Sequence, residues 1–141
     1  MTDLSAIVAR LRRHGLAGGL LAVLILAAAP PTAGAHGFAG PLAWGLLLAF
    51  CLLPLALSAH LVFDAALFRL AASYGTEEAG LAAVDDVLAR VGLRKKSPAP
   101  APLAARLAGC RRLVRLQWAS VVIALCLYAV LLLDAAGGGR A

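Results

Sequence analysis

The sequence predicts an all-α membrane protein, with two transmembrane helices and an N-terminal hydrophobic helix that is either a signal peptide or a third transmembrane helix. Two observations support this fold class. Of the 141 residues, 62% are hydrophobic and 14% are charged, whereas a soluble domain has about 25% charged residues. The apolar residues also gather into blocks, and such blocks belong in lipid, where a helix satisfies its own backbone polar groups.

The positive charge of the chain fits a membrane protein better than a nucleic-acid-binding protein. The net charge is +6, a value that both classes can show. Here the basic residues flank the apolar blocks, which is the pattern of membrane orientation. We therefore expect the lipid bilayer as a partner and no nucleic acid.

Residues 1–35 form the N-terminal hydrophobic segment. Its apolar block, Leu16–Ala29, is short beside the about 20 residues that a span needs, and a pair of prolines follows it. Arginines before the block and an Ala-x-Ala pattern ending at Ala35 are typical of a secretory signal peptide cleaved after that residue. An uncleaved first transmembrane helix is the competing interpretation, and the sequence leaves both open.

The second apolar block, Pro41–Phe63, lies in the segment 36–63, which begins with a short extracytoplasmic lead. The block contains no formally charged residue. As a helix it is about 34 Å long, enough to cross a hydrocarbon layer of about 30 Å. Pro54 lies in its middle and predicts a kink, because proline removes one backbone hydrogen bond.

The last transmembrane helix is predicted over 113–134, with its uninterrupted apolar part beginning at Trp118. Arg115 and Gln117 precede that part, and we expect their side chains to reach toward the headgroups. The Gly-rich residues 135–141 are predicted to be a disordered tail. Small residues four apart favour close helix contacts and occur as the pairs Gly15/Gly19, Gly45/Ala49 and Ser120/Ala124.

Residues 64–112 are predicted to be a cytoplasmic helical segment. The second helix continues to a stop near Gly75, after which Thr76 can cap a short amphipathic helix that ends at Gly92. A Pro-rich linker follows over 97–102, and a new helix from Pro102 leads into the last span. The short helix carries an apolar stripe at helical spacing, which we interpret as a docking surface for a partner: Leu81, Val84, Leu88 and Val91.

The distribution of Lys and Arg predicts the orientation of the chain. Basic residues concentrate before the first block and in 64–112, and there is none between the first two blocks. The positive-inside rule therefore places 64–112 in the cytoplasm and the C-terminus on the extracytoplasmic side. A composition rich in Ala, Gly and Arg suggests a bacterial inner membrane. Anionic headgroups or acidic side chains are the expected partners of Arg111, Arg112 and Arg115.

His60 and Asp64 form a polar pair four residues apart on one helix face, near membrane depth. Ionisable residues at this depth are functional candidates for proton or ion handling. The simpler structural interpretation is that Asp64 faces water or pairs with Arg112 or Arg115 at the start of the last helix. We favour the structural interpretation and keep the functional one as an alternative.

His36 is a speculative metal ligand. If cleavage follows Ala35, the new N-terminal amine and the His36 imidazole offer two nitrogen ligands to copper. The extracytoplasmic side otherwise offers few ligands, and three scattered cysteines give neither a disulfide framework nor a zinc site. We therefore expect no cofactor.

The sequence contains no nucleotide-binding, metalloprotease or serine-hydrolase motif, so we expect a protein that is not an enzyme. The favoured hypothesis is a small bacterial inner-membrane protein that acts as a non-enzymatic accessory or scaffold subunit of a larger membrane complex. The alternative is a small oligomeric transporter or metal-handling membrane protein that uses His36, His60 and Asp64.

Overall fold

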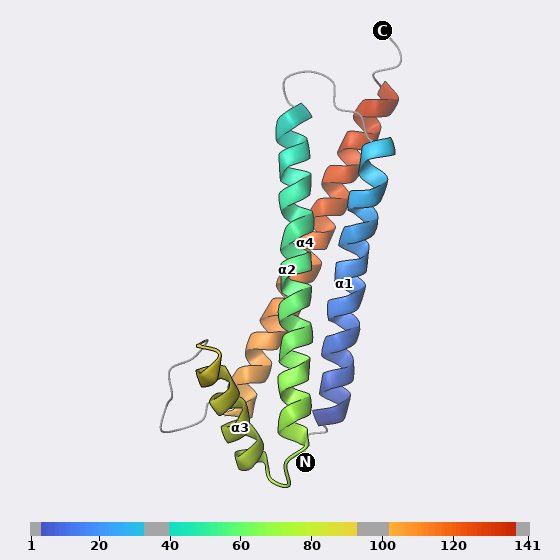
Figure 1. The fold of residues 1–141 in the computed structure, drawn as a ribbon. Helices are drawn as coiled ribbons and strands as arrows, with labels where there is room; N and C mark the ends of the chain where they lie inside the picture. The colour runs from blue at the N-terminus through green and yellow to red at the C-terminus, as the bar shows by residue number, and fades with distance from the viewer. Residues whose placement is uncertain (1–3, 33–39, 93–101, 138–141) are drawn as a thin grey trace.

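The described part of the chain forms four helices and no strand. The computed structural model describes residues 4–32, 40–92 and 102–137. The helices are α1 (Leu4–Thr32), α2 (Gly40–Ala72), α3 (Glu77–Arg90) and α4 (Leu103–Gly137) (Figure 1). The predicted all-α membrane-like fold is confirmed.

Three of the helices, α1, α2 and α4, are long and apolar enough to cross a membrane. Their 29, 33 and 35 residues correspond to about 44, 50 and 53 Å. Each helix is therefore longer than the about 30 Å of the hydrocarbon layer. α1 reaches this length because it begins at Leu4 and includes the arginines that precede the Leu16–Ala29 block.

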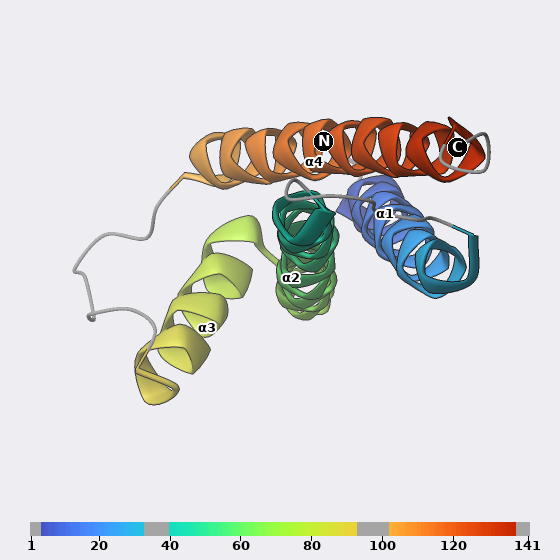
Figure 2. The same cartoon turned by 90° about the horizontal axis from the view of Figure 1, so that it is seen from above.

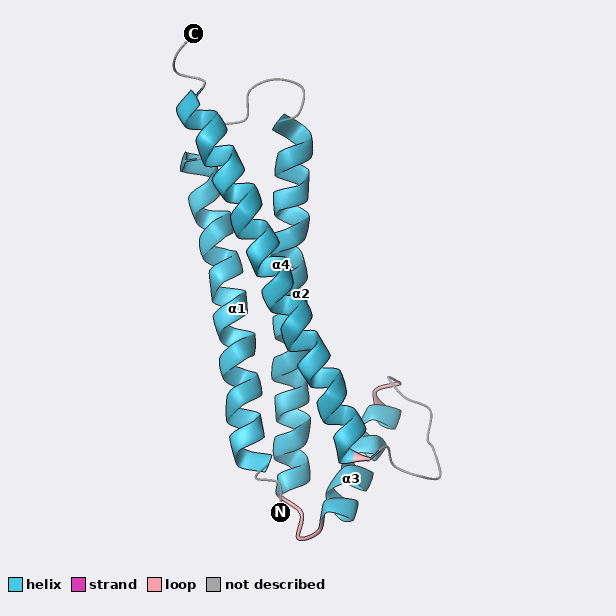
Figure 3. Cartoon of the chain, turned by 180° about the vertical axis from the view of Figure 1, so that it is seen from behind, coloured by secondary structure: helices cyan, strands magenta, loops and turns pink. Residues whose placement is uncertain are grey.

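The three long helices form one bundle, and α3 is attached to its side. α4 crosses both α1 and α2 on one face of the bundle, as the views from above and from behind show (Figures 2 and 3). α3 contacts α2 and lies beside the end of α2 and the beginning of α4 (Figure 1). The arginine-rich ends of α1 and α4 thus share one end of the molecule with α3 and the C-terminal end of α2. We call it the basic end.

The ends of α1 and α4 differ from the expected boundaries. Pro30 and Pro31 lie inside the last turn of α1 instead of ending the helix before it. The Thr32 hydroxyl donates to the Ala28 carbonyl and lies 2.6 Å from the Tyr128 hydroxyl of α4. These side-chain contacts stabilise the last turn of α1, where the two prolines have no N–H to donate. α4 continues to Gly137, three residues into the predicted tail.

The short helix α3 follows the predicted capping. The Thr76 Oγ1 accepts a hydrogen bond from the Ala79 N–H at 3.3 Å, and Gly92 has a φ of +74° just beyond the helix, a conformation that glycine adopts without a Cβ penalty. Gly80 allows α3 to pack closely on α2, because an added Cβ would lie 3.0 Å from the Ala71 Cα and carbonyl carbon.

Two apolar clusters fill the bundle. The cluster at the basic end comprises Leu11, Leu61, Ala65, Phe68, Leu81, Leu103 and Cys110. The cluster at the opposite end comprises Ala22, Ile25, Ala29, Leu47, Cys51, Ala124 and Leu131. The level between them is occupied by a buried polar side chain, Gln117.

Candidate functional site

Gln117 is the polar centre of the bundle. Its side chain is 0% exposed, and its Nε2 donates to the Ser58 Oγ of α2 at 2.7 Å and to the Gly15 carbonyl of α1 at 3.2 Å. The Pro54 carbonyl lies 3.5 Å from the same nitrogen. Because all three neighbours present oxygen acceptors, the amide nitrogen must face them, and one α4 side chain thereby joins all three long helices.

Glycines of α1 make room for this contact. A Cβ on Gly18 would lie 2.6 Å from the Gln117 Cδ, and one on Gly19 would lie 2.8 Å from the Ser58 Oγ. Both distances are below normal van der Waals contact, so only glycine permits this approach. A Cβ on Gly15 would lie 3.3 Å from the Leu61 Cβ, so the Gly15/Gly19 pair marks a helix contact, as its spacing predicted.

The expectation that Gln117 reaches toward the headgroups is wrong. Its position at the start of an apolar run suggested an interfacial side chain, but it points inward between α1 and α2. Ser120 and Ala124, the other small pair on α4, are buried as well. The Gly45/Ala49 pair differs, since Ala49 is exposed and a Cβ on Gly45 would meet nothing within 4 Å.

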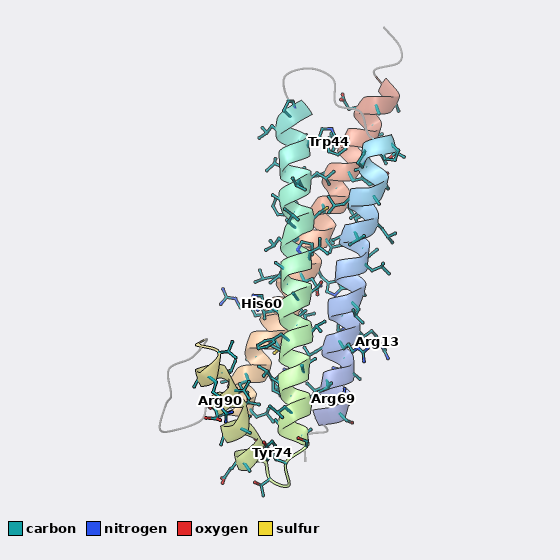
Figure 4. The ribbon with its side chains drawn as sticks, viewed as in Figure 1. Arg13, Trp44, His60, Arg69, Tyr74 and Arg90 are labelled. Carbon is teal, nitrogen blue, oxygen red and sulfur yellow. The ribbon has the colours of Figure 1, made fainter. Side chains whose placement is uncertain are left out.

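A groove of about 530 Å³ lies between α2, α3 and α4 at the basic end. We call it the α2–α4 groove. His60 and Asp64 both line it, together with Arg112. His60 is exposed and lies on the side of α2 away from α1 (Figure 4). The predicted polar pair thus shares one hollow.

Within that groove Asp64 is bound differently from the prediction. Its Oδ2 accepts a hydrogen bond from the Cys110 thiol of α4 at 3.4 Å, and no ion pair with Arg112 or Arg115 is seen in the described part of the chain. Cys110 is buried, whereas both arginines are exposed. The antiparallel α2–α4 packing does bring Asp64 to the start of α4, but opposite the apolar face of that helix.

An ion pair between Arg106 and Asp85 ties α3 to α4. The Arg106 Nη2 lies 2.6 Å from the Asp85 Oδ1, and the two side chains are only 14% and 19% exposed. Such a partly buried pair is screened less by solvent than a surface pair. Sequence reasoning missed it, because the partners lie 21 residues apart on two different helices. Most of the predicted Pro-rich linker between these helices lies outside the described residues.

The predicted docking stripe on α3 is largely used inside the chain. Leu81 and Val84 are buried, and Leu88 lines the α2–α4 groove with them. Only Val91, which is 63% exposed, remains open. A separate partner therefore has little of the stripe to bind in this arrangement.

A second groove, of about 600 Å³, lies between α1 and α4. We call it the α1–α4 groove. Its basic side chains are Arg10 and His14 from α1, and Arg111 and Arg115 from α4. At its edge the Trp118 indole contacts His14, with ring centroids 6.4 Å apart and planes at 87°, and Nε1 donates to Nδ1 at 3.4 Å. The three predicted arginines thus divide between two grooves, because Arg112 lines the other one.

The described residues do not form a metal-binding site. No group of three or more His, Cys, Asp and Glu side chains lies together there. His36 lies outside the described residues, so the structure says nothing of its surroundings. The cysteines Cys51, Cys110 and Cys126 are free.

No protein-family model, curated protein or solved structure matches this chain. The geometry itself indicates what the polar groups do. The hydrogen bonds of Gln117 to Ser58 and Gly15, the hydrogen bond of Cys110 to Asp64 and the Arg106–Asp85 pair run between helices. These groups hold the helices together as one unit.

Proposed function

We propose that this protein is a non-enzymatic accessory or scaffold subunit of a larger membrane complex, in a bacterial inner membrane. The proposal rests on one contrast between helix surfaces. The small residues Gly15, Gly18 and Gly19 of α1 pack against α2 and α4 of the same chain. Gly45 and Ala49 form a similar small-residue surface that no other described helix of the chain covers. In lipid, close approach of small residues is a main source of helix association.

The open surface runs along the outer face of α2. Ala56 and Ala59 are exposed too, and with Gly45 and Ala49 they lie opposite the buried positions Pro54 and Leu61. Larger apolar side chains alternate with these small residues, which gives the face both holes and knobs. A transmembrane helix of another subunit is the partner that fits such a face.

The proposed orientation follows from charge. The arginines of α1 and α4 gather at the basic end, and the positive-inside rule assigns that end, with α3, to the cytoplasm. The C-terminus of α4 then faces the extracytoplasmic side. A tag after Lys95 should be labelled only after the cells are permeabilised, and labelling in intact cells would contradict this orientation.

We further propose that α1 stays in the protein as a third transmembrane helix and is not removed as a signal peptide. Removal of residues 1–35 would take away the Gly15 carbonyl and leave Gln117 with its α2 acceptors alone, Ser58 and Pro54. The lost hydrogen bond contributes about 0.6 kcal/mol on the scale measured between membrane helices, and the packing of α1 in both apolar clusters would be lost with it. Intact mass of the protein from membranes should match the uncleaved chain, and a species beginning at His36 would refute this.

The complex itself can be tested by purification in mild detergent. We expect a tagged protein to co-elute with a fixed larger partner. Gly45→Leu with Ala49→Leu should remove most of that partner, because the leucines fill the surface a partner helix would approach. The matched control is Ala119→Leu with Ala129→Leu on the exposed face of α4, which should retain the partner.

The same purification separates the alternative function. His60 and Asp64 do line one groove, which favours keeping a small oligomeric transporter or metal-handling protein as the second candidate. A homo-oligomer with bound metal, or ion-dependent flux lost in Asp64→Asn at normal protein level, would support it. Such a result, without a larger partner, would refute the scaffold proposal.

A further inference from the structure

We infer that the α1–α4 groove binds the headgroup of an anionic phospholipid, with an acyl chain lying along the adjacent helix surfaces. This site is distinct from the outer face of α2 and needs no protein partner. Three features carry the inference: the charges in the groove, the apolar side chains between them, and the position of the groove along the bundle.

The charged side chains that line the groove are all basic. Arg10 approaches from α1, and Arg111 and Arg115 approach from α4, whereas no described acidic side chain lines the groove. Asp64 lines the other groove and accepts a hydrogen bond from Cys110, and Asp85 pairs with Arg106. Guanidinium groups bind phosphate oxygens through paired N–H donors, so a phosphodiester supplies the charge that the groove lacks.

The apolar lining distinguishes a lipid from a free anion. Ile7 and Leu11 of α1, and Leu107 and Val114 of α4, line the same groove as the arginines. A small inorganic anion would leave these side chains unused. A phospholipid presents an anionic phosphate and apolar chains together, which matches a groove of about 600 Å³ that is open on one side.

The position of the groove matches the surface of a bilayer. Its inner edge is the His14–Trp118 contact, and Trp118 begins the uninterrupted apolar part of α4. Tryptophan is enriched at the membrane–water boundary. The groove therefore opens at headgroup level, where basic pockets between transmembrane helices bind anionic lipids.

The neighbouring surface of α4 extends the site. Arg111 and Arg115 also line a smaller hollow of about 350 Å³ with Ala104 and Ala108. Both arginines can thus contact a headgroup from two sides. Arg12 and Arg13 line neither hollow, and Arg13 points away from the bundle (Figure 4).

The test measures lipid preference through Trp118. In a Trp44→Phe background, Trp118 is the only tryptophan left, and lipids with brominated chains quench it on binding. The purified protein in detergent is titrated with brominated phosphatidylglycerol and, separately, with brominated phosphatidylcholine. We expect the anionic lipid to be preferred by at least about tenfold, since each arginine at a membrane surface contributes about fivefold.

The decisive variant is Arg10→Gln, Arg111→Gln and Arg115→Gln together. We expect it to lose most of the preference, to within about threefold of parity. The matched control, Arg12→Gln, Arg13→Gln and Arg112→Gln, removes the same charge from the same two helices and should keep the preference. Lysines at the three groove positions retain the charge and should restore most of the preference.

Four results would overturn the inference. The first is the absence of any preference for the anionic lipid in the parent protein, and the second is an equal loss of that preference in the groove and control variants. The third is failure of the lysine variant to restore the preference, and the fourth is displacement of the lipid by an excess of inorganic phosphate. The last would identify a free-anion site instead. If the triple variant loses its helical circular dichroism, Arg111→Gln alone replaces it, with an expected loss of about fivefold.

Discussion

Replacement of Gly18 by alanine tests the packing at the centre of the bundle. The added methyl group would lie 2.6 Å from the Gln117 Cδ and 3.0 Å from its Cγ, so Gln117 must move. It has no free space, because its side chain is 0% exposed and donates to both Ser58 and Gly15. Movement would therefore break hydrogen bonds as well as packing.

The magnitude follows from three contributions. Overpacking of a filled core is unfavourable by about 1–3 kcal/mol. The two hydrogen bonds of Gln117 contribute about 0.6 kcal/mol each on the scale measured between membrane helices. Alanine in place of glycine returns about 0.5–1 kcal/mol, because glycine loses more backbone entropy in a helix. We expect Gly18→Ala to lower the free energy of unfolding by about 1–4 kcal/mol.

The assay is unfolding in mixed micelles with increasing SDS, followed by circular dichroism. Gly45→Ala is the matched control, because a Cβ there meets nothing within 4 Å, and it should be neutral or stabilising. Gln117→Ala in combination with Gly18→Ala supplies a double-mutant cycle, with an expected coupling of about 1 kcal/mol or more. Equal stability of Gly18→Ala and Gly45→Ala, or additive effects in the cycle, would refute the reasoning.

Three further substitutions test other contacts. Gln117→Glu should destabilise the bundle more than Gly18→Ala, since a carboxylate would face carbonyl oxygens; equal SDS-unfolding curves would contradict this. Gly80→Ala should loosen α3, because the new Cβ would press on the Ala71 backbone, and faster hydrogen exchange over 77–90 would report it. Arg106→Asp should also loosen α3, by about 1–2 kcal/mol, a value between those of exposed and fully buried ion pairs. Asp85→Arg added to it should restore the slow exchange, and failure to restore it would show that the ion pair does not hold α3.

The helices themselves could be predicted from the sequence because their signals are local. Apolar length identified the spans, and the Thr76 cap and Gly92 identified both ends of α3. The early start of α1 at Leu4 does not follow from the apolar pattern, because the arginines interrupt that pattern before Leu16. A helix that extends beyond the membrane can include them, since their guanidinium groups remain in water or among headgroups.

The contacts between helices could not be predicted, because they depend on which face of each helix turns inward. In a stretch as rich in Leu, Ala and Val as α4, apolar residues surround the helix and do not define a face. Gln117 and Cys110 were therefore assigned no partners, although Gln117 defines the inward face in the structure. One buried polar residue in an apolar span was the available signal, since lipid offers its amide no hydrogen bond.

The fate of α1 connects the proposals, because α1 contributes to both the polar centre and the α1–α4 groove. It supplies the Gly15 carbonyl to Gln117 and Arg10 and His14 to the groove. Cleavage after Ala35 would remove one wall of the groove and one of the acceptors of Gln117. The outer face of α2 would remain, so a scaffold that binds its partner there could survive cleavage, whereas selective binding of an anionic lipid could not. A cleaved protein that still prefers phosphatidylglycerol would therefore show that α4 alone carries the lipid site.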